Sequence, residues 1–316
     1  MDSKPIQLRE ESRLKCFLGV VFLYFEFLLK CVPLDVYFFK ITHFCGIEGF
    51  KSALKSVSLT MRNFFGVFGL IWKLYIAVVF GIIALLFYPF FLVLIMNPKW
   101  KKFSFKLFII WSWLMRIFCF YGVRVMEKAT LPQGPYIIVA NHTSYLDIFL
   151  LHSLLPQSPF VFLGKSEILR YPILGTYFKN LNIPVYRKDK SKAGQAYSMA
   201  NKAVAEGWSI VIFPEGTIPD HQCPKMIPFK DGAFKMAKTM GIPLLPLTFT
   251  NNYKLFSDPT DILGPAQPGI SRVYIHPFFT VEEMNGMEIS EIRQACFDRI
   301  NAPILSEYPH LFEENK

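Results

Sequence analysis

An uncharged stretch of 23 residues, Leu74 to Met96, restricts the fold of this 316-residue chain more than any other segment. As an α-helix it would be about 34 Å long, enough to cross the hydrocarbon core of a bilayer. Lysine residues flank it on both sides, whereas a single crossing collects positive charge on one side. A second apolar run, Leu107–Val123, follows closely. We therefore expect membrane-embedded helices that form a hairpin over 74–121, with limbs at 74–96 and 104–121 and both ends on the same side of the membrane.

The composition favours a membrane-bound protein over a nucleic-acid-binding one. Hydrophobic residues make up 52% of the chain, aromatic residues make up 16%, and the net charge is +10. A basic surface attracts either nucleic acid or an anionic membrane. The sequence contains no RNA-binding strand motif, zinc-finger spacing or recognition-helix pattern, so we expect a membrane partner and no nucleic acid. Two shorter apolar segments, Cys16–Leu29 and Val32–Phe44, are predicted to be helices at the membrane interface.

The cysteines and histidines do not suggest a metal site. Six cysteines are scattered along the chain without a Cys-x-x-Cys pair. This pattern argues against a disulfide framework and favours a reducing compartment that faces the cytosol. His221 and Cys223 are close in sequence, but two ligands without a third and a fourth make a poor zinc site.

From residue 124 onward the sequence has the pattern of a globular α/β domain. The predicted domains are therefore membrane-associated helices in 1–123 and an α/β domain in 124–316. Short apolar runs alternate there with helical patterns. The predicted strands are 136–140, 160–163, 183–186, 209–213, 244–249 and 272–276. The predicted helices are 145–155, 173–180, 191–206, 232–240 and 288–306. This alternation predicts a mostly parallel sheet covered by helices.

One candidate for catalysis is the stretch Asn141-His142-Thr143-Ser144-Tyr145-Leu146-Asp147, which follows the first of these strands. Inside a single helix, His142 and Asp147 would lie roughly 140° apart, so contact between them requires the histidine to precede the helix. A cap at Thr143 or Ser144 would let the helix begin between them. His142 Nδ1–H could then donate to Asp147 and leave Nε2 as a base for a hydroxyl. A surface histidine beside a helix cap is the alternative.

A second motif, Phe213-Pro214-Glu215-Gly216-Thr217, also follows a strand directly. Pro214 and Gly216 predict a tight, exposed turn that presents the Glu215 carboxylate. Because sites in parallel sheets lie beyond the carboxyl ends of the strands, both motifs are expected on the same rim. Three shorter elements accompany them: Gly164-Lys165-Ser166-Glu167-Ile168-Leu169, Val185-Tyr186-Arg187 and Phe229-Lys230-Asp231-Gly232-Ala233-Phe234.

This ordered set resembles the glycerolipid acyltransferases of the PlsC type, over roughly residues 120–280. The resemblance implies that His142 is the catalytic base and that Asp147 is its partner. For substrate binding it points to Glu215, Gly216, Thr217, Arg187, Lys165 and Lys230. Arg187 matches the arginine that holds the acceptor phosphate in the family.

Two positions depart from the family pattern around Arg187. The family has glycine six residues before this arginine and an acidic residue directly before it. Leu181 and Tyr186 stand at these positions here. A lysolipid with a different head group therefore remains an alternative acceptor.

The resemblance implies transfer of a fatty acyl group from acyl-CoA or acyl carrier protein to the free hydroxyl of a lysophospholipid. The expected acceptor is 1-acyl-glycerol-3-phosphate, which would give phosphatidic acid. The thioester is a co-substrate, so no cofactor and no metal are expected. Backbone N–H groups of the 142–144 turn are expected to stabilise the oxyanion. The catalytic domain is expected to face the cytoplasm, with the bacterial inner membrane favoured over the endoplasmic reticulum.

Rival functions predict features that can be checked in the sequence. A lipase or thioesterase should carry Gly-x-Ser-x-Gly after a strand, and this motif is absent. A phosphate-binding loop needs a glycine five residues before Gly164, where Pro159 stands. A non-catalytic membrane scaffold with an acyltransferase fold predicts damaged motifs, but His142, Asp147 and Glu215 are all present.

Overall fold

The computed structural model describes residues 66–186, 192–219 and 223–312. Residues after Phe68 form one compact unit, Gly69–Lys316. The predicted interfacial helices at 16–29 and 32–44 lie outside the described residues, as does Arg187.

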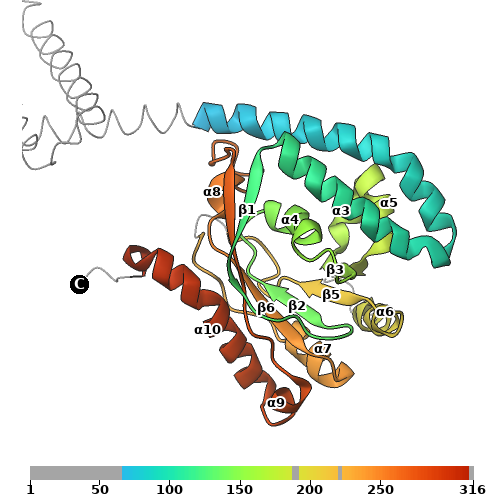
Figure 1. Cartoon of the computed structure of the whole chain (residues 1–316), viewed down its shortest axis with the longest axis vertical. Helices are drawn as coiled ribbons and strands as arrows, with labels where there is room; N and C mark the ends of the chain where they lie inside the picture. The colour runs from blue at the N-terminus through green and yellow to red at the C-terminus, as the bar shows by residue number, and fades with distance from the viewer. Residues whose placement is uncertain (1–65, 187–191, 220–222, 313–316) are drawn as a thin grey trace, which may run out of the picture. The chain divides into compact units, whose positions relative to one another are not determined.

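Two helices occupy the region of the predicted hairpin, and its place in a membrane stays a prediction. Helix Gly66–Met96 starts before the predicted residue 74, and it is joined through the short turn η1 (Pro98–Trp100) to α3 (Lys101–Phe118). The two helices lie side by side and run antiparallel (Figure 1). Near the start of the hairpin the Tyr75 hydroxyl donates to the carbonyl of Phe118 at 2.8 Å. Near its turn the rings of Phe91 and Phe108 lie 4.6 Å apart.

Helix Gly66–Met96 has two different faces. Its buried face carries Ile76, Ile83 and Phe91, which pack with α3 and with the helices that follow it in the domain. Its opposite face is exposed and apolar. By length and composition it is the one helix among the described residues that could cross a membrane. The helix therefore offers one apolar face to its surroundings and uses the other as part of the domain core.

A seven-stranded sheet in the order β1-β7-β6-β2-β5-β3-β4 forms the centre of the domain. Its strands are β1 (Tyr121–Lys128), β2 (Ile137–Ala140), β3 (Phe160–Lys165), β4 (Ile183–Val185), β5 (Ser209–Ile212), β6 (Leu244–Phe249) and β7 (Gly269–Ile275). All neighbouring pairs are parallel except β6 and β7. The prediction of a mostly parallel α/β sheet is confirmed.

Helices connect these strands and cover the sheet. They are α4 (Leu146–Leu154), α5 (Pro172–Leu181), α6 (Ala193–Ala205), α7 (Gly232–Met240), α8 (Asn252–Leu255), α9 (Val281–Asn285) and α10 (Ile289–Glu307), with short 3₁₀ turns η2 (Ser166–Arg170) and η4 (Pro309–Leu311). Helices α3, α4 and α5 lie on one face of the sheet, and α7 and α10 lie on the other (Figure 1). Every predicted strand and helix of this domain is present, with small shifts at the ends.

Strand β1 was not predicted. It pairs with β7 at the edge of the sheet, and from Arg124 onward its side chains are exposed. It therefore lacks the alternation of buried and exposed residues that identifies a strand in sequence. It also extends across the predicted boundary between 1–123 and 124–316, so its first residues, assigned from sequence to the membrane segment, belong to the sheet.

The central strands bring the two motifs together. All four residues of β2 are fully buried, and β2 lies between β5 and β6. Val139 pairs with Ile212, the last residue of β5, and Ala140 pairs with Leu247 of β6. Since these strands are parallel, the segments that leave their carboxyl ends meet at one rim of the sheet.

Candidate active site

His142 and Asp147 meet across the turn between β2 and α4. Helix α4 begins at Leu146, so the histidine precedes the helix and the aspartate lies in its first turn. His142 Nδ1 lies 3.1 Å from Asp147 Oδ2, which confirms the predicted contact. A neutral imidazole that donates from Nδ1 to this carboxylate has its free lone pair on Nε2. Ser144 supports the turn, because its Oγ accepts from the N–H of Leu146 at 3.0 Å.

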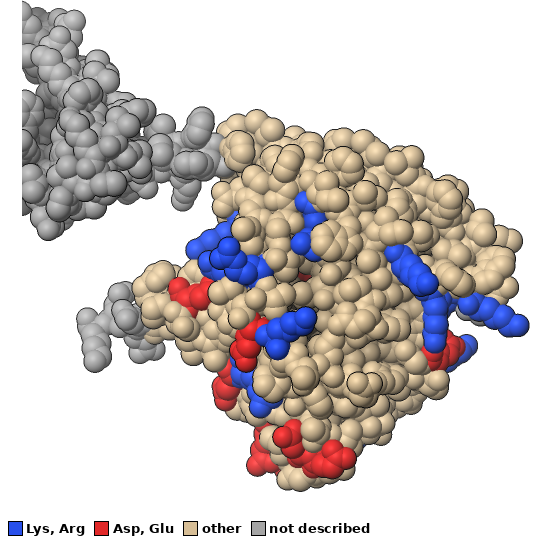
Figure 2. Space-filling view, in the orientation of Figure 1, with Lys and Arg blue, Asp and Glu red and all other residues tan. Residues whose placement is uncertain are grey.

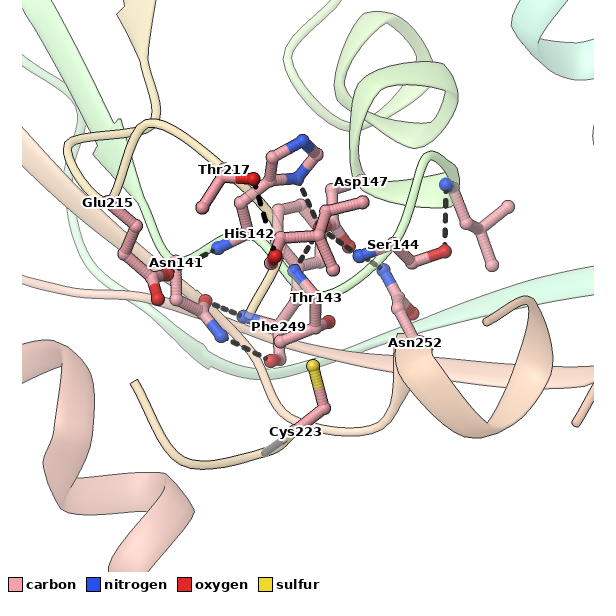
Figure 3. Close-up of polar contacts among 12 residues, drawn as sticks. Asn141, His142, Thr143, Ser144, Asp147, Glu215, Thr217, Cys223, Phe249 and Asn252 are labelled. Carbon is pink, nitrogen blue, oxygen red and sulfur yellow. Dashed lines mark hydrogen bonds and ion pairs between the residues drawn. The ribbon is translucent and has the colours of Figure 1, made fainter. Parts of the chain in front are cut away.

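The Asp147 carboxylate is buried and is held by four donors. Besides His142, its Oδ2 accepts from the backbone N–H groups of Thr143 at 2.8 Å and Ser144 at 2.9 Å (Figure 3). Its Oδ1 accepts from Asn252 Nδ2 at 2.7 Å. These hydrogen bonds fix the position of the carboxylate. The carboxylate is therefore placed to orient the imidazole.

Asn252 is a site residue that the sequence analysis missed. It is fully buried and begins α8, shortly after β6 ends. A related contact lies beside it, where the amide of Asn141 exchanges two hydrogen bonds with the backbone of Phe249, at 2.9 and 2.8 Å. Both asparagines thus join the end of β2 and the turn after it to the end of β6. A single asparagine after a strand has no spacing pattern that would reveal such a role.

Glu215 reaches the same turn, but from the opposite side of His142 to Asp147 (Figure 3). Its Oε1 accepts from the backbone N–H of His142 at 2.8 Å, and its Oε2 accepts from the N–H of Ile227 at 3.0 Å. The prediction of an exposed carboxylate is wrong, because only 1% of Glu215 is exposed. Both oxygens face backbone donors, so the side chain positions the His142 turn. Its role in binding the acceptor stays a prediction.

Burial also changes the acidity of Glu215. Desolvation raises its pKa from the ordinary 4.5 to about 7, against the lowering effect of its two hydrogen bonds, and the nearby Asp147 adds to the rise. The folded protein thus keeps this proton at pH values where the unfolded chain has lost it. The resulting stabilisation is complete below pH 4.5 and declines as the pH rises toward 7.

We predict that Glu215→Gln removes this pH dependence. Glutamine keeps the volume and one acceptor but cannot ionise. The free energy of unfolding of the wild type relative to the variant should fall by about 3 kcal/mol between pH 4.5 and 7. Thermal unfolding of both proteins in detergent across this pH range measures the difference. A Tm difference that stays constant with pH would contradict the assignment.

The backbone donors expected for the oxyanion are already engaged. The N–H of His142 bonds Glu215, and those of Thr143 and Ser144 bond Asp147. The prediction that this turn stabilises the oxyanion is therefore wrong. The N–H groups of this turn donate to the carboxylates of Glu215 and Asp147. None of these three N–H groups is therefore left for the substrate.

The His142 ring opens into a cavity of about 740 Å³. The ring stacks on Phe213, with the centroids 4.1 Å apart, and 13% of the side chain is exposed. Lys165, Gly216 and Thr217 line the same cavity. Lys165 Nζ and Thr217 Oγ1 lie 3.4 Å apart, so the carboxyl end of β3 and the turn after β5 meet at this point.

The deeper wall of the cavity is apolar. It includes Phe105 of α3, Phe160 of β3 and Trp208, all buried, whose rings lie close together. His152 is also in this wall and stacks on Phe108 at 5.0 Å. Burial lowers the pKa of His152 to about 3, so its imidazole is neutral and suits an apolar wall. The cavity therefore combines a polar region near His142 with an apolar region that suits an alkyl chain.

Residues 122–250 match the protein-family model Acyltransferase. This part of the chain belongs to the acyltransferase family. A 1-acyl-sn-glycerol-3-phosphate acyltransferase of Saccharomyces cerevisiae is 36% identical over 149 residues, which are 46% of this chain and 48% of the relative. One from Chlamydomonas reinhardtii is 32% identical over 160 residues, 50% of this chain and 46% of the relative. The 1-acyl-sn-glycerol-3-phosphate acyltransferase beta of Homo sapiens is 31% identical over 152 residues, which are 44% of this chain and 51% of the relative.

The matches span about half the length of these curated relatives. A solved structure extends the likeness of the fold beyond the acyltransferase domain. The crystal structure of the 1-acyl-sn-glycerophosphate acyltransferase PlsC from Thermotoga maritima superposes with a TM-score of 0.63 at 21% identity. The superposition covers 76% of this chain and 96% of that one, so it includes residues outside 122–250.

The acyltransferase domain thus brings most of the predicted site residues to one rim. Lining the cavity are His142, Lys165, Gly216 and Thr217. Asp147 and Glu215 lie behind the His142 turn and support it. Lys230 is exposed and does not line the cavity. Its backbone N–H donates to the carbonyl of Pro214. Arg187 lies outside the described residues, so its role stays a prediction.

Proposed function

We propose that this protein transfers a fatty acyl group from an acyl thioester to the free hydroxyl of a lysophospholipid. The acceptor is 1-acyl-glycerol-3-phosphate and the product is phosphatidic acid. The contact between His142 and Asp147 beside a cavity with a largely apolar wall carries this proposal. The relatives are named as acyltransferases of this acceptor.

Proton transfer through His142 is the central step of the proposed reaction. Nε2 accepts the proton of the acceptor hydroxyl while its oxygen bonds to the thioester carbonyl carbon. Asp147 stabilises the imidazolium that develops. The carbon–sulfur bond then breaks, and the proton passes from Nε2 to the departing thiolate. Acyl-CoA or acyl carrier protein supplies the thioester, and the reaction uses no metal or other cofactor.

The shape of the cavity supports an acyl substrate. Its apolar wall leads from His142 toward Phe105 and Trp208 between α3 and the sheet. A volume of about 740 Å³ falls in the range of cavities that enclose a small-molecule ligand. An acyl chain in this space would place its carbonyl carbon near Nε2 of His142.

A second head group is compatible with the charges at the cavity. Lys165 and Arg170 line it and would attract a phosphate, but Glu167 and Asp258 line it as well. Carboxylates at this position would favour a head group that carries an amine beside its phosphate. Another lysolipid with a zwitterionic head group is therefore the second candidate acceptor.

The decisive experiment is an assay of the purified full chain with a lysolipid panel and both donors. Labelled lysophosphatidate with acyl-CoA or with acylated acyl carrier protein should give labelled phosphatidate. Preference for lysophosphatidylethanolamine would favour the second candidate. No product from any lysolipid with either donor would refute the proposed function and leave a non-catalytic scaffold.

We predict that Lys165→Met weakens recognition of the phosphate. The KM for lysophosphatidate should rise roughly tenfold or more, because a charge-assisted hydrogen bond is lost, while the KM for the acyl thioester stays the same. Steady-state kinetics measure both values. Lys179→Met is a matched control, since Lys179 is exposed on α5 and does not line the cavity. Equal effects of both variants would refute a specific role for Lys165.

The helical hairpin would hold this site at the membrane. We propose that both limbs, Gly66–Met96 and α3, enter one leaflet and that the catalytic domain faces the cytoplasm, in the bacterial inner membrane rather than the endoplasmic reticulum. Phe105 and Phe108 of α3 line the cavity, so the hairpin forms part of the acyl-binding wall. Chains that partition into the bilayer would then reach His142 without crossing water.

A further inference from the structure

The loop 256–266, between α8 and β7, exposes two apolar side chains. Its ends are joined by a bridge between Phe256 and Ala266. At its tip, Ile262 is 61% exposed and Leu263 is 55% exposed. Two successive turns lead to this tip, since the N–H of Asp261 bonds the carbonyl of Asp258 at 3.0 Å and the N–H of Gly264 bonds that of Asp261 at 2.9 Å. A hydrogen-bonded loop therefore holds both side chains outward.

This loop is fixed to the first turns of helix Gly66–Met96 (Figure 1). Lys73 is buried, and its Nζ donates to the carbonyl oxygens of Asp261 and Asp258. The backbones also approach closely, because a Cβ added at Gly69 would lie 2.9 Å from the carbonyl oxygen of Gly264. The position of the tip is therefore set by the helix that could cross a membrane.

Exposed aromatic side chains at the end of α3 lie beside the first turns of the same helix. Phe120 is 65% exposed, and its ring lies 6.4 Å from that of Trp72. Phe118 is exposed beside Tyr75. Between these groups the helix exposes its own apolar face, and Figure 2 shows the edge of the molecule along this helix without charged side chains. Exposed apolar residues at one edge, free of charge, mark an interaction surface.

We propose that Ile262 and Leu263 insert into the lipid bilayer as a second membrane contact beside helix Gly66–Met96. Lipid is the partner because the loop that carries the tip is bonded to the first turns of a helix that is long and apolar enough to enter a membrane. Asp258, Pro259 and Thr260 of the same loop line the cavity that holds His142. Insertion of the tip therefore fixes the mouth of the cavity at the lipid surface.

Fluorescence quenching tests the insertion independently of catalysis. The full chain carrying Leu263→Trp is reconstituted in vesicles of phosphatidylcholine and phosphatidylglycerol, with and without bromine on the acyl chains. The emission added by this tryptophan, relative to the parent protein, should be blue-shifted and quenched by bromine. Leu305→Trp on α10, where Leu305 is 40% exposed, is the matched control and should not be quenched. Equal quenching at both positions, or none at position 263, would overturn the proposal.

A kinetic test asks whether insertion matters to the reaction, and it rests on the proposed function. Ile262→Asp with Leu263→Asp should raise the KM for lysophosphatidate in vesicles about tenfold or more, because charged groups enter the interface poorly. The kcat/KM for a short-chain, water-soluble lysophosphatidate should not change. Equal losses on both substrates would indicate damage to the loop itself and overturn the proposal. If neither protein acylates any lysolipid, the quenching result still decides the membrane contact.

Discussion

His142→Ala is expected to lower kcat by about 10²- to 10⁴-fold, the range that a general base contributes. The backbone N–H of residue 142 still bonds Glu215, so the turn keeps its position. The removed ring stacks on Phe213 and only 13% of the side chain is exposed, so some packing against Phe213 is lost while the turn stays in place. The KM for the acyl thioester should therefore change little.

Steady-state acyl transfer by the full chain measures this effect, and thermal unfolding checks the fold. His310→Ala is the matched control, because His310 is an exposed residue in η4, away from the cavity. Turnover of the His142 variant within tenfold of the wild type would mean that another group accepts the proton.

Asp147→Asn is expected to lower kcat by about 10²- to 10⁴-fold with little loss of stability. The new amide oxygen can still accept from Thr143, Ser144 and His142. Its NH₂ group would face Asn252, whose own Oδ1 has no hydrogen-bond partner and can be presented by a flip of that amide. The variant therefore keeps the contacts and removes the charge that stabilises the imidazolium.

Comparison with Asp147→Ala separates charge from structure. Alanine leaves the buried N–H groups of Thr143 and Ser144 without an acceptor, at a cost of about 1–3 kcal/mol each. We expect the asparagine variant to keep the wild-type Tm and the alanine variant to lose several degrees. An asparagine variant that turns over as fast as the wild type would show that the charge is not needed.

The sequence predicted much of the fold because the domain repeats a simple pattern. The four residues of β2 form a continuous apolar run, as a strand buried on both faces requires. The turn between His142 and Asp147 followed from helix geometry, since five residues within one helix cannot bring the two side chains together. The shared rim followed from the parallel order of the strands.

Features that depend on distant partners could not be predicted. Asn252 reaches Asp147 across 105 positions in the chain, and only the folded sheet brings the two together. The burial of Glu215 depends on the N–H groups of His142 and Ile227, which no local pattern reveals. The expected oxyanion donors were wrong for the same reason, because both carboxylates had already engaged them.

The double-sided helix Gly66–Met96 has a practical consequence for handling this protein. Ile76, Ile83 and Phe91 share a core with Leu150 and Tyr177 of the domain. A fragment that starts at residue 124 would expose the domain side of that core to water. We expect this fragment to precipitate. Substituting the exposed apolar residues of the helix with hydrophilic ones, and keeping its buried residues, is the better route to a protein that needs no detergent.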